Sequence, residues 1–330
     1  MDRQVTVAVG FPVRDEVLEA IGRVDPRVRV VHLPGIARPG APGAGADEWK
    51  QQLAGADVLF GPTSIPREFI EAAPNLRWFQ VINAGVDRLA QEGLLDRGFV
   101  VTNVSGLVAV SIAEWVMGTA LMLAKNLHQA VRAQGERRWS AWRVGELAGQ
   151  TMGIAGLGAI GRETARRARA FDMRVIASRR TAAPGAADPD CDEVVGYDDL
   201  ARLLRESDYL VLCVPLTAET HHLIGARELA MMKPTATLVN IARGAVVDQE
   251  ALIAALRQGT IAAAALDVFD PEPLPAESPL WGMENVIMTP HISGSIEGYG
   301  RRSAELFVEN LGRFVSGEKL MNVVDPGLGY

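Results

Sequence analysis

One stretch of the chain restricts its fold more than any other: a short, mostly apolar run followed at once by three spaced glycines. Residues 151–155 have the character of a buried parallel strand. Gly156, Gly158 and Gly161 follow in the spacing G-x-G-x-x-G and open an Arg- and Ala-rich helical stretch. A strand, a glycine-rich turn and a helix in this order form the context that dinucleotide binding requires. The stretch therefore predicts a βαβ unit that binds a dinucleotide.

The three glycines have different tasks in such a unit. The first permits a tight turn, the second lets the backbone approach a pyrophosphate, and the third lets the helix pack closely against the strand. The helix N-terminus adds free N–H groups and the positive end of the helix dipole. We therefore expect Gly156, Gly158 and Gly161 to bind the cofactor.

The strand that closes this unit, residues 174–178, ends in Ser178, Arg179 and Arg180. NAD sites place a carboxylate about 20 residues into the motif, where it accepts a hydrogen bond from the ribose 2′-hydroxyl. A carboxylate would repel a 2′-phosphate, whereas guanidinium groups can bind one through paired hydrogen bonds. These residues favour NADP(H) over NAD(H). The alternative is that both arginines belong to a solvated loop beside an Arg-rich helix.

Length and charge narrow the class of protein. With 330 residues the chain can form two domains, and its net charge of −7 argues against a general nucleic-acid binder. No apolar run reaches the roughly 18 residues of a membrane span, and the N-terminus alternates like a strand rather than a signal peptide. Two cysteines, Cys191 and Cys213, give neither a disulfide framework nor metal-ligand spacing. We expect a cytoplasmic protein without a metal, and with no nucleic-acid or membrane partner.

Alternating strand and helix patterns predict an α/β fold of two Rossmann-like or flavodoxin-like domains with parallel sheets. Residues 1–103 and 290–330 are expected to form a discontinuous substrate-binding domain, because a C-terminal helix at about 296–315 returns to the first domain. Residues 104–289 form the dinucleotide-binding domain, and the active site lies in the cleft between the domains. Residues 108–131, apolar on most sides, predict one long buried helix.

Residues 134–147 contain Trp139 and Trp142 and have no regular pattern. They form either a folded loop or a subunit contact, since exposed tryptophans are typical of interfaces.

The residues that follow each strand of the dinucleotide domain are candidates for chemistry, because ligands of open parallel sheets bind beyond the carboxyl ends of the strands. In this chain the segments that follow strands are Val214-Pro215, Ile241-Ala242-Arg243, 267–272 and Pro290-His291.

At these segments the chain resembles the D-isomer-specific 2-hydroxyacid dehydrogenases. The resemblance covers most of the chain, from Asn83-Ala-Gly-Val-Asp87 to Thr289-Pro-His-Ile-Ser-Gly294. It includes the fingerprint and the motifs Cys213-Val-Pro-Leu-Thr217, Met232-Lys-Pro234, Leu238-Val-Asn-Ile-Ala-Arg-Gly-Ala-Val-Val-Asp248 and Ala265-Leu-Asp-Val-Phe-Asp-Pro-Glu-Pro273.

The resemblance implies that Arg243, Glu272 and His291 are catalytic. Arg243 suits a substrate carboxylate because its planar donors can bind one with two hydrogen bonds. His291 can donate a proton near neutral pH, and Glu272 can orient the imidazole and stabilise its charged form. Singly, each is also compatible with an ordinary surface or loop residue. All three residues, however, lie beyond the ends of strands and inside matching motifs, and this combination favours a catalytic role.

Further residues follow from the resemblance alone. Backbone N–H groups of Ala84 and Gly85 are expected to bind the substrate carboxylate, together with Arg243 and His291. Ala159 and Ile160 would contact the pyrophosphate. The nicotinamide would be lined by Val214, Pro215, Ile241, Ala242, Asp267 and Gly294. The family commonly has Asp where this chain has Arg179, and a homodimer is usual for it.

The implied reaction is the interconversion of a 2-keto acid and its D-2-hydroxy acid by hydride transfer to or from NAD(P). We expect a glyoxylate/hydroxypyruvate-type reductase, because NADPH use and the complete Arg, Glu and His set favour keto-acid reduction. A phosphoglycerate or phosphite-type dehydrogenase of the same family is an alternative. A dinucleotide-sensing binding protein, like the corepressors that share the three residues, is another.

Overall fold

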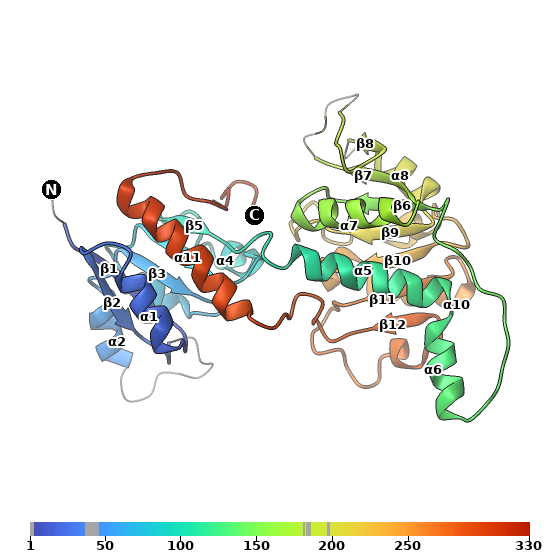
Figure 1. The fold of residues 1–330 in the computed structure, drawn as a ribbon, viewed down its shortest axis with the longest axis horizontal. Coiled ribbons are helices and arrows are strands. Elements are labelled where there is room, and N and C mark those ends of the chain that lie inside the picture. Colours follow the sequence, from blue (N-terminus) through green and yellow to red (C-terminus); the bar gives the residue numbers. More distant parts are fainter. Residues whose placement is uncertain (1–2, 37–45, 181, 183–185, 197–198) are drawn as a thin grey trace. The chain divides into compact units, whose positions relative to one another are not determined.

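The computed structural model describes residues 3–36, 46–180, 182, 186–196 and 199–330, which form two compact units (Figure 1). Unit 1 comprises Met1–Leu107 and Glu297–Tyr330, and unit 2 comprises Val108–Ile296. The chain thus crosses between units after residues 107 and 296, a few residues later than the expected boundaries at 103/104 and 289/290.

Hydrogen bonds explain both shifts. Val104 N–H donates to the carbonyl of Asn83 at 3.3 Å, which ties the segment after residue 103 to unit 1. Ile292 and Ser293 donate their N–H groups to the Asp267 carboxylate, each at 2.9 Å, which ties the segment after residue 290 to unit 2.

Unit 1 is built on a five-stranded parallel sheet in the order β2-β1-β3-β4-β5, the order of the flavodoxin-like fold. β1, β3 and β4 are buried almost throughout and are mostly apolar, as expected for a sheet covered on both faces. The strands are β1 (Val5–Val9), β2 (Val28–His32), β3 (Val58–Gly61), β4 (Trp78–Val81) and β5 (Val100–Thr102).

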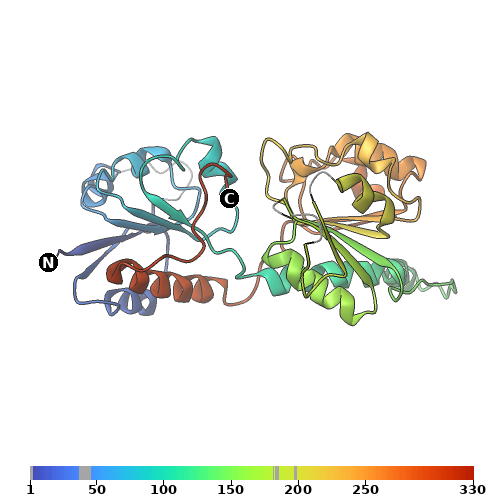
Figure 2. The same ribbon diagram turned by 90° about the horizontal axis from the view of Figure 1, so that it is seen from above.

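Helices cover both faces of this sheet (Figure 2). α1 and α11 pack together on one face, where Phe307 of α11 stacks on Phe60 and Trp78 at centroid distances of 4.1 and 5.2 Å. The other face is covered by α2, α3 and α4. The helices are α1 (Asp15–Gly22), α2 (Ala46–Leu53), α3 (Arg67–Glu71), α4 (Asp87–Gln91) and α11 (Tyr299–Ser316).

Unit 2 is built on a seven-stranded parallel sheet in the order β12-β11-β10-β9-β6-β7-β8. Counted from β6, this is the doubly wound order 3-2-1-4-5-6 with one added edge strand. The strands are β6 (Thr151–Ala155), β7 (Arg174–Ser178), β8 (Glu193–Val195), β9 (Tyr209–Leu212), β10 (Thr237–Asn240), β11 (Ala263–Leu266) and β12 (Val286–Met288). The two parallel sheets confirm the predicted α/β fold.

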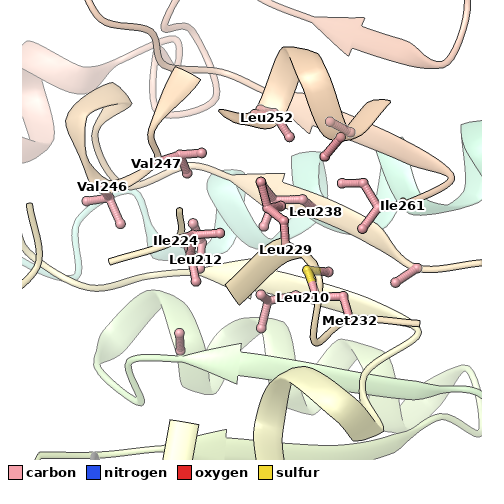
Figure 3. Packing of buried hydrophobic residues seen from close by; sticks show 14 of the residues in the cluster. Leu210, Leu212, Ile224, Leu229, Met232, Leu238, Val246, Val247, Leu252 and Ile261 are labelled. Atoms are coloured by element: carbon pink, nitrogen blue, oxygen red, sulfur yellow. The ribbon is translucent and has the colours of Figure 1, made fainter. Parts of the chain in front are cut away.

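One face of this sheet carries α8, α9 and α10, whose leucines belong to the main core of unit 2. α8 contacts β6 and β7, and Figure 3 shows Leu229 of α9 and Leu252 of α10 in the same cluster as Leu210 of β9 and Leu238 of β10. The opposite face carries α5 and α7 (Figure 2). Asp248 caps α10 by accepting a hydrogen bond from Ala251 N–H. The helices are α5 (Ala109–Ala124), α6 (Leu127–Gly135), α7 (Ala159–Ala170), α8 (Leu200–Glu206), α9 (Ala226–Leu229) and α10 (Gln249–Gln258), with 3₁₀ turns η2 (Gly244–Val246) and η3 (Pro279–Gly282).

The single helix expected over 108–131 is wrong. Asn126 adopts a left-handed conformation, with φ 52°, and divides the segment into α5 and α6. Asn is one of the few residues that enter this region readily, so it can end one helix and begin the next. α5 packs chiefly on α7 and is not buried all round, since Val110 is exposed. Among the described residues, no helix combines the length and apolarity needed to cross a bilayer.

Candidate active site at the strand ends

The fingerprint lies where the sheet of unit 2 changes direction. β6 neighbours both β7 and β9, so chain connections leave it toward opposite sides, and a crevice forms beyond the carboxyl ends at such a point. Gly156 follows β6 with φ 102°, a conformation that favours glycine. A Cβ on Gly156 would lie 2.8 Å from the carbonyl of Cys213, after β9. The turn therefore needs glycine here for both its shape and its close packing.

The other two glycines also match their tasks. A Cβ on Gly161 would overlap the carbonyl oxygen of Gly156, so this glycine permits the close contact of helix and turn. A Cβ on Gly158 would meet nothing within 4 Å, which leaves the backbone there accessible from outside.

The N-terminus of α7 presents main-chain donors in this crevice. Arg162 N–H closes the first helical bond to the carbonyl of Gly158. The N–H groups of Gly158, Ala159, Ile160 and Gly161 have no acceptor among the described residues. With the positive end of the helix dipole, these donors fit the pyrophosphate of a dinucleotide.

The end of β7 is anchored to the fingerprint and to β8. The Ser178 carbonyl accepts from Gly156 N–H at 3.2 Å, and Arg179 N–H donates to the carbonyl of Val195 in β8 at 3.1 Å. The Nε atom of Arg179 is buried and has no partner within the described part of the chain. The Arg180 side chain is exposed. The sequence did not predict β8, which is only three residues long.

The segment after β9 supplies Val214 and Pro215, both partly exposed. The Thr220 hydroxyl donates to the carbonyl of Pro215 at 2.6 Å and fixes the turn. Burial raises the pKa of the Cys213 thiol to about 12. This thiol therefore stays protonated at neutral pH and cannot act as a nucleophile there.

Arg243 follows β10 in a loop that two other residues shape. The buried side chain of Asn240 donates to the Arg243 carbonyl at 3.0 Å and accepts from Ala242 N–H at 3.1 Å. A Cβ on Gly244 would overlap the carbonyl of Phe269, so the Arg243 loop packs backbone to backbone against the loop after β11. Ile241 and Ala242 are buried beside it.

His291 and Glu272 meet across the ends of β11 and β12. His291 Nδ1 lies 2.8 Å from Glu272 Oε2, and Glu272 Oε1 accepts from Phe269 N–H at 3.0 Å. Because a carboxylate only accepts, Nδ1 is the protonated nitrogen and Nε2 is left to face a substrate. Both side chains remain partly accessible, with 49% and 36% exposure.

Asp267 organises the loop that carries His291. Its carboxylate is 1% exposed and accepts hydrogen bonds from the Thr289 hydroxyl at 2.5 Å and from Ile292 and Ser293 N–H. Its carbonyl accepts from His291 N–H at 2.8 Å, although His291 is left-handed with φ 53°. The expected nicotinamide contact of Asp267 stays a prediction. The structure gives its carboxylate the further task of holding this loop.

Three expected residues lie elsewhere in the fold. A Cβ on Gly294 would lie 3.3 Å from Val108, so Gly294 packs at the start of α5. Ala84 and Gly85 belong to unit 1, in the turn between β4 and α4. Their N–H groups donate to no other described residue.

The structure thus brings Glu272 and His291 into direct contact. It also packs the Arg243 loop, at Gly244, against the loop that carries Glu272. Sequence reasoning missed Asn240 and Gly244. The sequence offered two signals: Asn240 is a polar residue at the end of an apolar strand, and Gly244 directly follows the arginine. No group of acidic, His or Cys side chains suited to a metal ion occurs in the ranges that the structure describes.

Comparisons with known proteins identify the family of the chain. Residues 117–293 match the model for the D-isomer specific 2-hydroxyacid dehydrogenase, NAD binding domain. A glyoxylate reductase of Thermococcus litoralis is 38% identical over 298 residues, which span 87% of this chain and 88% of the relative.

Another relative is the D-3-phosphoglycerate dehydrogenase of Methanocaldococcus jannaschii, 37% identical over 86% of this chain. The match spans only 55% of that longer protein. Among solved structures, a D-isomer specific 2-hydroxyacid dehydrogenase from Xanthobacter autotrophicus Py2, in complex with NADPH and MES, is 33% identical with a TM-score of 0.84. The alignment covers 99% of this chain and all of that one.

Proposed function

This chain belongs to the family of D-isomer-specific 2-hydroxyacid dehydrogenases, and we propose that it reduces glyoxylate or hydroxypyruvate with NADPH. The contact between His291 and Glu272 carries the proposal, because it pairs a proton donor with the carboxylate that orients it. The glyoxylate reductase relative supports the choice of substrate.

Each residue has one task in the proposed reaction. Arg243 binds the substrate carboxylate and polarises the neighbouring carbonyl. When bound, the reduced nicotinamide supplies the hydride to the carbonyl carbon. Nε2 of the charged His291 donates the proton that converts the developing alkoxide to a hydroxyl, and Glu272 stabilises the imidazolium beforehand. In the oxidative direction the neutral His291 accepts that proton.

We propose that the cofactor lies across the fingerprint, with its pyrophosphate at the N–H groups of 158–161. The absence of a side chain at Gly158 leaves space for the pyrophosphate. The N–H groups at the start of α7, which have no acceptor among the described residues, can donate to it. Val214, Pro215, Ile241, Ala242, Asp267 and Gly294 are the proposed nicotinamide contacts.

We propose a preference for NADP(H) that depends on Ser178, Arg179 and Arg180. The buried Nε of Arg179, unpartnered among the described residues, can donate to a 2′-phosphate. The Xanthobacter structure, which contains NADPH, supports this preference. The solvated-loop alternative predicts equal use of both cofactors.

The test is initial-rate reduction of glyoxylate and hydroxypyruvate with NADPH and NADH side by side, in wild type and Arg179→Asp. We expect a strong preference for NADPH in wild type and its loss in the variant. Activity with NADH alone would refute the phosphate contact but keep the dehydrogenase. Tight cofactor binding without turnover of either keto acid would favour the dinucleotide-sensing protein.

A second candidate is phosphoglycerate dehydrogenase activity, which the Methanocaldococcus relative favours. Reduction of 3-phosphohydroxypyruvate in the same assay separates the candidates. A kcat/KM for this phosphorylated substrate above those for the two smaller keto acids would replace the proposed substrate. A phosphite-type dehydrogenase would reduce none of the three and would oxidise phosphite.

We propose further that the protein is a cytoplasmic homodimer that uses the surface of α6 and the following segment. Leu127, Val131, Trp139 and Val144 are exposed there, and Trp139 is fully exposed. Exposed apolar side chains gathered in one segment are typical of a subunit contact. Sedimentation equilibrium of wild type and Trp139→Glu tests this. Wild type should be dimeric, and the variant should have a higher dimer dissociation constant. A monomeric wild type would contradict the proposal.

A further inference from the structure

The turn that contains Ala84 and Gly85 is fixed by one side chain that none of the predicted sites includes. Asn103 follows β5 and is buried, with 7% exposure. Its Nδ2 donates to the carbonyl of Ala84 at 2.9 Å, and its Oδ1 accepts from Ser105 N–H at 2.9 Å. Both ends of the side-chain amide are thus engaged, which determines its orientation.

Peptide planarity turns this hydrogen bond into a constraint on the N–H groups. In a trans peptide the C=O of one residue and the N–H of the next point in opposite directions. The Ala84 carbonyl points at Asn103, so the Gly85 N–H points away from it. The Asn83 carbonyl accepts from Val104 N–H at 3.3 Å, so the Ala84 N–H also points away from this segment. Residues 103 and 104 therefore hold two successive N–H groups outward on the same side.

Asn103 is itself held firmly. Its carbonyl accepts from Gln80 Nε2 at 3.1 Å, and its N–H donates to the carbonyl of Asn322 at 3.1 Å. Gln80 Oε1 accepts in turn from Thr102 and from Asn310 of α11, at 2.7 and 3.0 Å. The side chains of Gln80, Thr102 and Asn310 are fully buried and hydrogen-bonded, so the network resists rotation of the Asn103 side chain.

We propose that Asn103 is a positioning residue for the carboxylate of the keto acid: it orients the Ala84 and Gly85 N–H groups, which bind that carboxylate. The inference rests on the proposed function and extends it to a residue that does not touch the substrate. Two adjacent N–H groups held outward form an anion-binding concavity of the kind that backbone nests provide.

The side chain has to be an amide. An aspartate in place of Asn103 would be the same size and would still accept from Ser105 N–H. It would, however, set an oxygen against the Ala84 carbonyl and place a negative charge beside the anion site. Asn103→Asp therefore tests orientation and charge without a change of volume, and Asn103→Ala tests orientation alone.

The experiment compares KM for glyoxylate, kcat, the Ki of oxamate and the Kd of NADPH in these variants. For Asn103→Ala we expect KM and Ki to rise about five- to tenfold, the effect of losing one hydrogen bond, with kcat and the NADPH Kd within about twofold. For Asn103→Asp we expect a rise of about 50-fold or more, since repulsion is added. Unchanged KM and Ki in Asn103→Asp would overturn the proposal, as would a loss of kcat at constant KM.

Asn75 provides the matched control. Its Nδ2 also donates to a main-chain carbonyl of unit 1, that of Ala54, at 2.9 Å. Asn75→Ala and Asn75→Asp should leave KM and Ki unchanged, and a rise equal to that of the Asn103 variants would show a merely structural effect. If Asn103→Ala does not fold, the equally sized Asn103→Asp decides.

A titration of the full chain with oxamate, followed by amide NMR, separates this inference from the proposed function. We expect the Ala84 and Gly85 amide signals to shift in wild type and to stay in place in Asn103→Asp. If the wild type reduces neither keto acid, the proposed function is refuted, but this titration still tests the role of Asn103. Identical shifts in wild type and Asn103→Asp would refute the positioning role of Asn103.

Discussion

The two units supply the proposed reaction with different chemistry. Unit 2 contributes side chains at the ends of three neighbouring strands: Arg243 after β10, Glu272 after β11 and His291 after β12. Under the proposal, unit 1 would contribute main-chain N–H groups in the turn of Ala84 and Gly85, where Asn103 donates to the Ala84 carbonyl. Substitution in unit 2 removes a functional group, whereas substitution in the turn leaves its N–H groups in place. Activity should therefore be sensitive to residue type in unit 2 and tolerant in the turn.

The largest effect is expected for His291→Ala, because His291 is the proposed proton donor and the substitution removes the imidazole that Glu272 orients. We predict that kcat falls about 10²- to 10⁴-fold, the usual share of a general acid. The NADPH Kd from fluorescence titration should stay unchanged, since the fingerprint is intact. Turnover close to that of wild type would contradict the acid/base role.

Arg243→Lys should have the next largest effect. A lysine keeps the charge but lacks the planar pair of donors, so it cannot hold a carboxylate through two hydrogen bonds. We predict a fall in kcat/KM of about 100-fold, as for a misplaced substrate, from steady-state kinetics with glyoxylate. A loss of less than about tenfold would show that charge alone suffices.

Gly244→Ala asks how much the placement of Arg243 depends on backbone packing. The added Cβ would overlap the Phe269 carbonyl, so the loops must separate. We predict a loss of about 1–3 kcal/mol of unfolding free energy in denaturant titrations, as for other overpacked sites, together with reduced kcat/KM. Gly282→Ala is the control, because a Cβ there meets nothing within 4 Å. Equal stability of the two variants would refute the packing argument.

The smallest effect is expected in the turn of unit 1. Ala84 is exposed, and Ala84→Ser keeps its N–H. We predict a KM for glyoxylate within about twofold of wild type, the usual range for a surface substitution. A large rise in KM would show that the side chain at position 84 matters, and the contrast between the two units would fail.

The same contrast explains what the sequence could predict. The strands of residues 151–155 and 174–178 were predicted because both are buried and mostly apolar. The fingerprint was recognised by its glycine spacing, and a Cβ at Gly156 or Gly161 would indeed meet main-chain atoms. Arg243, Glu272 and His291 were found because their side chains carry distinctive chemistry, and their roles stay predictions.

Other features depend on pairings that no local pattern contains. β8 has three residues and is recognisable only by its pairing with β7. Asn126 ends one helix and begins the next through its left-handed backbone conformation. The apolar residues around it predicted a continuous helix instead. The three hydrogen bonds to the Asp267 carboxylate join residues 22 to 26 positions apart, and the bond from Asn103 to Ala84 spans 19. Such contacts become visible only once the strands are assembled.

The most direct measurement of the central claim is the chirality of the product of hydroxypyruvate reduction by NADPH, resolved by chiral chromatography after full conversion. Hydride delivery to one face of a keto acid held by Arg243 and protonated by His291 should give a single enantiomer, D-glycerate. L-glycerate, a racemate or the absence of product would contradict the account.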